Sequence, residues 1–256
     1  MQSLIEFIGQ NQVILFLLLF TRLSGLFAFF PFFSHTRIPM SIKTALVFFM
    51  TIFLFPLATL PNIEFSVVGI GLALVSEILL GLIAGLFLII VFAMLQMAGM
   101  SISFVMGFTM ASVVDPQSGT SSPIISTIFT LLALVLLLAF NGHHLMIMFI
   151  VKSLDLLPLG SFYPTQNIWD YLLGAVSSMF IFGFILSFPI VGLSLLADIV
   201  FGMLMKTMPS FNLLVVGFPI KIMVAFVVMF VVLASTMLVF KREMLEAIGK
   251  LSVLFI

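Results

Sequence analysis

The sequence predicts an all-helical integral membrane protein, and its composition and hydropathy pattern carry that prediction. Of the 256 residues, 63% are hydrophobic and only 7% are charged, whereas soluble domains are about half apolar and a quarter charged. A bilayer core about 30 Å thick requires about 20 apolar residues in a helix, and six stretches approach or exceed that length. They are residues 12–33, 43–60, 66–100, 124–151, 168–205 and 210–240.

Two of these stretches, 66–100 and 168–205, are too long for one straight span. Both contain glycines, and the second also contains Pro189. Glycine and proline are tolerated in membrane helices but also break them. Each long stretch is therefore either one long tilted helix or a broken hairpin.

Turn-forming residues separate the apolar stretches. Clusters of Pro, Gly, Asn and Ser lie around residues 35, 62 and 161, and clusters of this kind mark loops. No polar segment is long enough to isolate a second folding unit. We therefore expect one domain over residues 1–256.

Charge, cysteine content and motifs exclude several functional classes. The chain has no cysteine, which removes disulfides, thiolate metal ligands and thiol nucleophiles together. Its net charge is zero, which argues against a nucleic-acid partner, because such partners require a basic patch. The sequence contains no GxSxG, HExxH, Walker or GxGxxG motif. We expect neither an enzyme nor a bound cofactor.

The histidine pair after residue 141 is the nearest approach to a catalytic or metal-binding cluster. Asn141, His143 and His144 follow an apolar run, and the only other histidine is His35. Adjacent helical residues point about 100° apart, so neighbouring histidines rarely share a metal. A metal site is one interpretation of this cluster. We favour a structural interpretation, in which Asn-Gly ends or kinks a helix and the histidines bond to freed carbonyl groups.

Methionines at spacing three form a second candidate site. Met94, Met97 and Met100 lie along one helical stripe, and thioethers are ligands that select Cu(I). Methionine is also a flexible filler of apolar gaps, so the stripe fits core packing or a deformable pore seal as well. We favour packing over the other two alternatives.

Arg22 is the clearest charge inside an apolar stretch. It lies near the middle of residues 12–33, about 15 Å of helix from either end, and an ionisable group at membrane depth costs roughly 3 kcal/mol or more. Arg22 therefore needs a buried partner, and Glu77 is a good candidate. Glu77 shares one helix face with Gly81 and Gly85, so we expect that face to be a helix interface.

A second set of charges lies near the end of the chain. Asp198, Gly202 and Lys206 repeat the spacing of the first set, and Gly202 would allow another backbone to come close. Lys221 lies near one end of the final apolar run, residues 219–240, and we expect both ends of this run to reach headgroups or water. For the charges at Arg22, Glu77, Asp198 and Lys206, a structural ion pair is favoured over a transport role.

One polar segment stands between two strongly apolar runs. Residues 106–123 are small, polar and rich in turn formers, and the segment exceeds a minimal connection. Long loops of this kind are often functional, although a solvated loop outside the membrane fits the composition equally well.

Four motifs in their order along the chain resemble the FliR family of flagellar export-gate proteins, whose injectisome relatives serve virulence-type secretion. The motifs are FTRLSGLFAFFPFFSHTRIPMSIKTAL, AGMSISFVMGFTMASVVDPQSGTSSPIIS, LAFNGHHLMIM and VVGFPIKI. The resemblance covers nearly the whole chain, and the NGHH run is closer to the flagellar branch.

The resemblance implies a non-enzymatic subunit of a hetero-oligomeric channel for unfolded flagellar proteins. FliP-like and FliQ-like subunits and an FlhB-like component would be its partners. It also implies tilted helical hairpins in the bacterial inner membrane, within the flagellar basal body. Part of that assembly would be raised above the membrane on the periplasmic side, so six apolar runs need not be six crossings.

The family further has a loop that plugs the closed gate, and this loop corresponds to residues 107–123. A polar, pliable backbone suits a plug, because an arriving polypeptide displaces it without exposing a sticky surface. The flanking large side chains would add a compressible seal. The candidate plug residues are Gly107, Phe108, Met110, Ser112, Asp115, Pro116, Ser118, Gly119, Ser121 and Ser122.

Alternatives to a flagellar gate subunit remain open at the level of sequence. A virulence-type injectisome subunit would share the fold. A soft-metal transporter would use the methionine stripe and the histidine pair. A membrane enzyme would need polar residues that converge from several helices, and the acidic residues are few.

Overall fold

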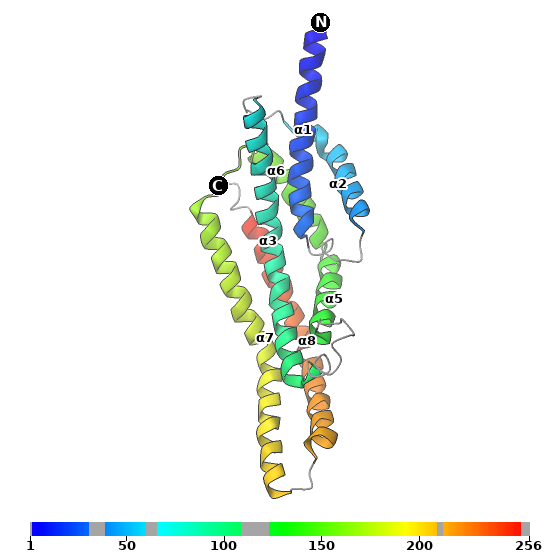
Figure 1. Ribbon diagram of the computed structural model, residues 1–256, viewed down its shortest axis with the longest axis vertical. Helices are drawn as coiled ribbons and strands as arrows, with labels where there is room; N and C mark the ends of the chain where they lie inside the picture. The colour runs from blue at the N-terminus through cyan, green and yellow to red at the C-terminus, as the bar shows by residue number, and fades with distance from the viewer. Residues whose placement is uncertain (1, 31–38, 60–65, 109–122, 209–211, 252–256) are drawn as a thin grey trace. The chain divides into compact units, whose positions relative to one another are not determined.

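The structure is a computed structural model, and it describes residues 2–30, 39–59, 66–108, 123–208 and 212–251. All regular structure within these ranges is helical, with no strand, so the predicted all-helical class is confirmed. In chain order the long helices are α1 (Gln2–Phe29), α2 (Met40–Leu54), α3 (Val67–Met106), α5 (Ile124–Ala139), α6 (Gly142–Leu156), α7 (Gln166–Thr207) and α8 (Phe218–Lys250) (Figure 1). A short 3₁₀ helix, η1 (Phe55–Leu57), follows α2, and a π-helical turn, η3 (Leu213–Gly217), precedes α8.

Five helices in the described ranges are long and apolar enough to cross a membrane, and α5 with α6 would add a sixth. The two overlong stretches are each a single helix, because α3 has 40 residues and α7 has 42 and contains Pro189. The stretch 124–151 is broken instead. Its two halves, α5 and α6, meet at 64°, and Asn141 between them has φ 58°, a left-handed conformation that asparagine tolerates. The predicted Asn-Gly kink is confirmed.

The chain forms two compact units. Unit 1 comprises Met1–Ile90, Leu138–Ala175 and Met244–Ile256, and unit 2 comprises Val91–Leu137 and Val176–Glu243. The divisions fall inside α3, α7 and α8, so each of these helices contributes to both units. The expectation of a single domain over the whole chain stays a prediction.

In unit 1, glycines bring the backbones of α1 and α3 into contact. A Cβ atom added at Gly81 would lie 2.6 Å from the carbonyl oxygen of Arg22 and 2.7 Å from the amide nitrogen of Leu26. One added at Gly25 on α1 would lie 3.2 Å from the Cα atom of Gly81. Only a residue without a Cβ atom permits so close an approach.

The same contact continues one turn along α3. A Cβ atom added at Gly85 would lie 2.6 Å from the Cβ atom of Phe29. The structure therefore places Gly81 and Gly85 in a helix interface, on the face of α3 that also carries Glu77.

In unit 2, the second part of α3 packs against α5 and α8. A Cβ atom added at Gly99 would lie 2.4 Å from the Cα atom of Ser126 on α5. The ring of Phe92 meets the ring of Phe240 on α8 edge-on, with centroids 5.1 Å apart. Within its most apolar 18-residue stretch, 61% of α3 is buried, against 22% for α7 and 11% for α8. Helix α3 is therefore the core helix, whereas α7 and α8 leave most of their apolar surface uncovered.

We expect Gly81→Ala to destabilise the protein by about 1–3 kcal/mol, because the new methyl group would meet backbone atoms of α1 that have no rotamer to yield. Gly71→Ala is the matched control on the same helix, since a Cβ atom there would meet nothing within 4 Å. The check is the thermal unfolding midpoint of the detergent-solubilised protein, followed by circular dichroism. Equal midpoints for the two variants would contradict the α1–α3 contact.

Candidate functional site

Arg22 and Glu77 form a buried ion pair between α1 and α3. The Nε atom of Arg22 donates to Oε2 of Glu77, and Nη2 donates to Oε1 at 2.9 Å. Arg22 is 2% exposed and Glu77 is completely buried. The structure thus pairs Arg22 with the partner that the sequence indicated, in the two-pronged geometry that makes arginine–carboxylate bonds strong.

The other side of the Arg22 guanidinium caps the end of α6. Nη1 donates to the carbonyl oxygen of Ser153 at 3.0 Å, to its Oγ at 3.2 Å and to the carbonyl oxygen of Leu157 at 3.3 Å. The last carbonyl groups of a helix have no partner within the helix and carry partial negative charge. The carbonyl oxygen of Ser153 also accepts from the amide of Leu157 at 3.1 Å, so Arg22 is its second donor. Through this oxygen and the carbonyl of Leu157, the first residue after α6, one side chain on α1 binds the end of α6.

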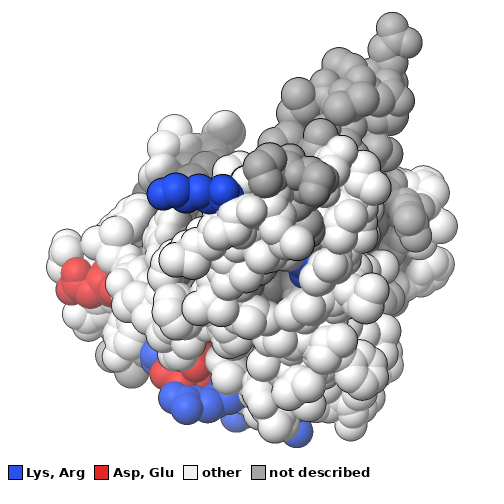
Figure 2. Space-filling model, turned by 90° about the horizontal axis from the view of Figure 1, so that it is seen from below, with Lys and Arg blue, Asp and Glu red and all other residues white. Residues whose placement is uncertain are grey.

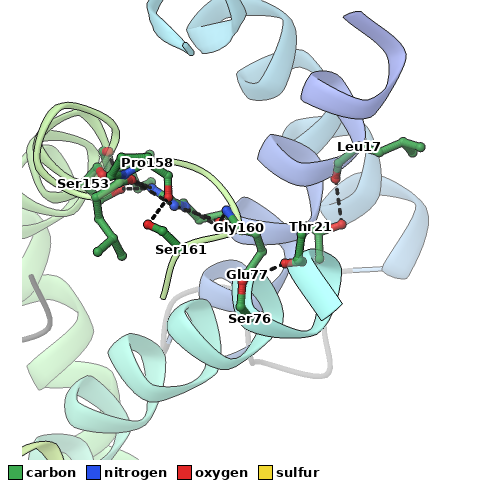
Figure 3. Close-up of polar contacts among 12 residues, drawn as sticks. Leu17, Thr21, Ser76, Glu77, Ser153, Pro158, Gly160 and Ser161 are labelled. Atoms are coloured by element: carbon green, nitrogen blue, oxygen red, sulfur yellow. Dashed lines mark hydrogen bonds and ion pairs between the residues drawn. The ribbon is translucent and has the colours of Figure 1, made fainter. Parts of the chain in front are cut away.

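Glu77 in turn holds the loop between α6 and α7. The amide of Gly160 donates to Oε1 of Glu77 at 2.6 Å, and Figure 3 shows the two residues side by side. Gly160 has φ 79°, in the left-handed region that favours glycine. The turn is closed by Ser161, whose amide and hydroxyl both donate to the carbonyl oxygen of Pro158. We call Arg22, Glu77, Ser153, Leu157 and Gly160 the buried ion-pair network.

The completeness of this network explains how two charges are tolerated away from water. Burying an ion costs several kcal/mol, and mutual attraction offsets that cost only when the remaining hydrogen-bonding positions are also satisfied. Here the carboxylate receives two arginine donors and one amide, and the guanidinium also reaches two carbonyl groups. Removing either charge would leave the other buried alone.

A second ion pair joins α7 to α8 in unit 2. Nζ of Lys221 donates to both carboxylate oxygens of Asp198 at 2.7 Å. Lys221 is only 6% exposed, whereas Asp198 is 50% exposed. The expectation that the amine of Lys221 reaches headgroups or water is therefore wrong. The amine is buried and donates to the half-exposed carboxylate of Asp198 on the neighbouring helix.

The remaining members of the predicted α7 set do not join this pair. Lys206 lies in the last turn of α7 and is exposed. A Cβ atom added at Gly202 would meet nothing within 4 Å, so the expected close approach of another backbone is not made by the described part of the chain.

The histidine pair does not build a metal site in the described residues, which contain no group of three or more potential ligands. The rings of His143 and His144 lie 4.4 Å apart, and the structure does not describe His35. Nδ1 of His143 is buried without a hydrogen-bond partner among the described residues. The expected bond from this nitrogen to a freed carbonyl group is therefore not made.

The methionine stripe is divided between core and surface. Met94 is buried and Met100 is exposed. A Cβ atom added at Gly183 on α7 would lie 3.1 Å from Sδ of Met97 and 3.2 Å from the carbonyl oxygen of Met94. Met94 and Met97 therefore fill the α3–α7 contact, which agrees with the packing interpretation.

Two of the candidate plug residues are described. Gly107 follows the end of α3 and has φ 86°, and the ring of Phe108 meets the ring of Phe226 on α8 with centroids 6.1 Å apart. The other eight lie outside the described residues. They are Met110, Ser112, Asp115, Pro116, Ser118, Gly119, Ser121 and Ser122.

Several members of the two ion-pair sites were not predicted from the sequence. Lys221 carried a usable signal, since a charge at the start of an apolar run requires either an aqueous exit or a partner. Gly25, three residues after Arg22, carried the small-residue signal of a close helix contact. Leu157 and Gly160 carried none, because they take part through backbone groups that every residue possesses.

Long apolar helices tied together by buried ion pairs define a polytopic helical membrane protein. Residues 13–247 match the family described as bacterial export proteins, family 1. Flagellar biosynthetic protein FliR of Bacillus subtilis (strain 168) is 33% identical over 231 residues, which are 89% of this chain and 89% of that protein. FliR of Escherichia coli (strain K12) is 31% identical over 204 residues, 79% of this chain and 78% of that protein. The chain belongs to the FliR family of bacterial export proteins, which confirms the resemblance.

We expect Arg22→Leu and Glu77→Leu each to cost about 3–5 kcal/mol, because each leaves a buried charge without its partner. The double variant should cost less than the sum of the two, since it leaves no lone charge. The yield of folded protein and its unfolding midpoint measure both effects.

Lys250→Ala is the control, because Lys250 pairs with Glu246 at 2.7 Å while both side chains are about half exposed. A pair of that kind is worth about 0.3–0.5 kcal/mol. Strictly additive losses at Arg22 and Glu77 would show that the two side chains do not interact.

Proposed function

We propose that this chain is a core subunit of the flagellar type III protein-export gate in the bacterial inner membrane. With FliP-like and FliQ-like subunits it would form a channel for unfolded flagellar proteins, in contact with an FlhB-like component. Membership of the FliR family and the names of the flagellar relatives support the assignment to flagellar export. In this proposal the chain helps to form the passage for exported proteins and does not catalyse a reaction.

The length of the uncovered apolar surface on α7 carries the argument for protein partners. Exposed large apolar side chains continue from Leu173 to Met203, a distance of about 45 Å along the helix. A bilayer core is about 30 Å thick, and an average tilt of about 20° shortens the projected length only slightly. Lipid tails therefore cannot cover the whole face, and the remainder would stand in water unless other subunits pack on it.

Helix α8 has the same property to a greater degree. Only 11% of its most apolar stretch is buried, and Phe230 is 81% and Val231 72% exposed. Figure 2 shows how sparse the charged groups are on one face of the molecule. An assembly in which sister subunits cover these helices, with part of it on the periplasmic side, would place the excess apolar length against protein.

The proposal includes a plug formed by residues 107–123. In support, α3 ends at Met106, and the next residue, Gly107, has a left-handed backbone conformation at the start of the polar segment. The contact of Phe108 with Phe226 holds the first residue after that turn against α8. A segment anchored at such a point can be displaced without unfolding the helices behind it.

We expect the chain to be recovered as a monodisperse species only when FliP-like and FliQ-like subunits are co-expressed, because α7 and α8 otherwise expose apolar surface. Size-exclusion chromatography of the detergent-solubilised chain, with and without the two subunits, is the test. A well-behaved monomer in the absence of partners would count against the proposal, as would failure of the subunits to co-purify.

Deleting a few residues around Ser118 and Gly119 should raise leakage of ions and small solutes through the resting gate while leaving assembly intact. A polar loop contributes few buried contacts, so shortening it changes stability little, whereas a narrow aqueous path responds to a missing few ångströms of filler. The measurements are co-purification of partners and membrane conductance. Unchanged conductance in a fully assembled deletion variant would rule out the plug.

A further inference from the structure

A cavity lies inside unit 1, among side chains of α1, α2 and α6. Its volume is about 290 Å³, and it is partly open to the surface. All of the residues that line it belong to unit 1, so a single compact part of the chain forms it. We call it the α2 cavity. Its walls include Phe27 and Phe30 of α1, Leu46 and Met50 of α2, and Met146 and Ile150 of α6.

The walls of the α2 cavity are almost entirely apolar. His143 is the single polar side chain among the described residues that line it, and Nδ1 of His143 is buried, so this nitrogen does not open on the cavity. A polar group that entered would lose its hydrogen bonds to water and find no replacement, which costs free energy, whereas a hydrocarbon loses none. The cavity therefore suits a hydrocarbon.

The volume of the α2 cavity indicates how much hydrocarbon it can hold. An apolar cavity of about 150 Å³ in a protein core binds benzene, so the α2 cavity holds roughly twelve carbon atoms by proportion. Voids larger than a water molecule are few in folded proteins, because the atoms that line an empty space lose their dispersion contacts. A hydrocarbon segment of this length would restore those contacts.

Lys43 places a positive charge at one end of the cavity. Lys43, Leu46 and Met50 lie at spacings of three and four residues and so share one side of α2, with Lys43 one turn before Leu46. The side chain of Lys43 is half-buried, and it makes no ion pair with any residue that the structure describes. A cation beside an apolar cavity suits a ligand with a hydrocarbon tail and an anionic head.

The length of α2 favours lipid as the source of that ligand. The apolar span Met40–Leu57 has 18 residues, about 27 Å of helix, which is close to the thickness of a bilayer core of about 30 Å. Only 17% of its most apolar stretch is buried, and lipid tails can cover the rest because the span does not exceed the core. Lys43, in the first turn, would then lie at the level of the headgroups, with Leu46 and Met50 at the depth of the acyl chains.

We propose that the α2 cavity binds one acyl chain of an anionic phospholipid, and that Lys43 binds the phosphate of the same lipid. The site is complete within unit 1, so this inference does not rest on the proposed gate. The bound chain contacts side chains of all three helices and so adds to the packing of α2 against α1 and α6. A zwitterionic phospholipid carries the same tails but no net charge, so its attraction to Lys43 is weaker.

Photo-labelling of the unmodified chain tests the occupant. Membranes that contain the full chain are loaded with phosphatidylglycerol that bears a diazirine on one acyl chain, and labelled residues are identified by mass spectrometry. Ile52 is the internal control, because it is 49% exposed and points about 200° away from Met50 on α2. We expect Met50 to be labelled several-fold more than Ile52, and this excess to shrink with phosphatidylcholine that bears the same diazirine.

Two results of the labelling would overturn the proposal. Equal labelling of Met50 and Ile52 would mean that α2 meets only bulk lipid. Label at Ile52 without label at Met50 would mean that something other than lipid, such as a segment of another protein, fills the cavity. Neither result bears on the proposed function, which does not require this lipid.

Lys43→Gln tests the headgroup, and Lys152→Gln is its control because Lys152 is exposed on α6 and does not line the cavity. We expect Lys43→Gln to lower labelling of Met50 by phosphatidylglycerol about fivefold, the effect of one lysine on an anionic lipid, and to leave labelling by phosphatidylcholine unchanged. Lys152→Gln should change neither. Equal losses in the two variants would show a general effect of surface charge and overturn the role of Lys43.

Met50→Trp tests the cavity by filling it, and Ile52→Trp is the matched control on the other side of α2. After removal of lipid from the full chain in detergent, dilauroyl phosphatidylglycerol should raise the thermal unfolding midpoint of the unmodified chain and of Ile52→Trp, but not of Met50→Trp. An equal rise with free laurate would assign the cavity to a fatty acid, and a rise kept in Met50→Trp would place the lipid elsewhere. Either result overturns the proposal. If Met50→Trp does not fold, the labelling of the unmodified chain decides.

Discussion

Arg22 and Glu77 neutralise each other in a place where neither charge reaches water. Their pairing fixes how α1 and α3 are aligned along their lengths. The guanidinium also binds the carbonyl oxygens of Ser153 and Leu157, so the end of α6 is held beside the same ion pair. Glu77 extends the constraint to the loop before α7 through the amide of Gly160. A slip of any of these elements by one turn would leave an unpaired charge or an unsatisfied backbone group in an apolar environment.

Close backbone contact is the condition for that pairing. Gly25 and Gly81 let α1 and α3 approach to a distance at which the short reach of Glu77 suffices for a two-pronged bond with Arg22. Helix α3 uses the same device again in unit 2, where Gly99 lies against α5 and Gly183 of α7 lies against Met94 and Met97. Small residues thus make α3 the core helix of both units.

The two ion pairs differ in how fully the chain completes them. The network around Arg22 is closed, with donors and acceptors matched inside unit 1. The pair around Asp198 is open on one side, on a helix whose apolar surface is longer than a bilayer core. A closed network stabilises the fold of the chain itself, whereas the open pair leaves a half-exposed carboxylate on the surface of α7.

The helical class, the apolar stretches, the Asn-Gly kink and the need of Arg22 for an acidic partner could all be predicted from the sequence. Each follows from composition, hydropathy or the free-energy cost of a buried charge, and these depend on residue type and spacing alone. Three outcomes could not be predicted without the folded chain: α3 and α7 are unbroken, and Lys221 is buried against Asp198. The third is that Ser153, Leu157 and Gly160 complete the network around Arg22. Those outcomes depend on which backbone groups and which distant side chains come together in space, and a backbone carbonyl or amide carries no mark in the sequence that shows which side chain it will meet.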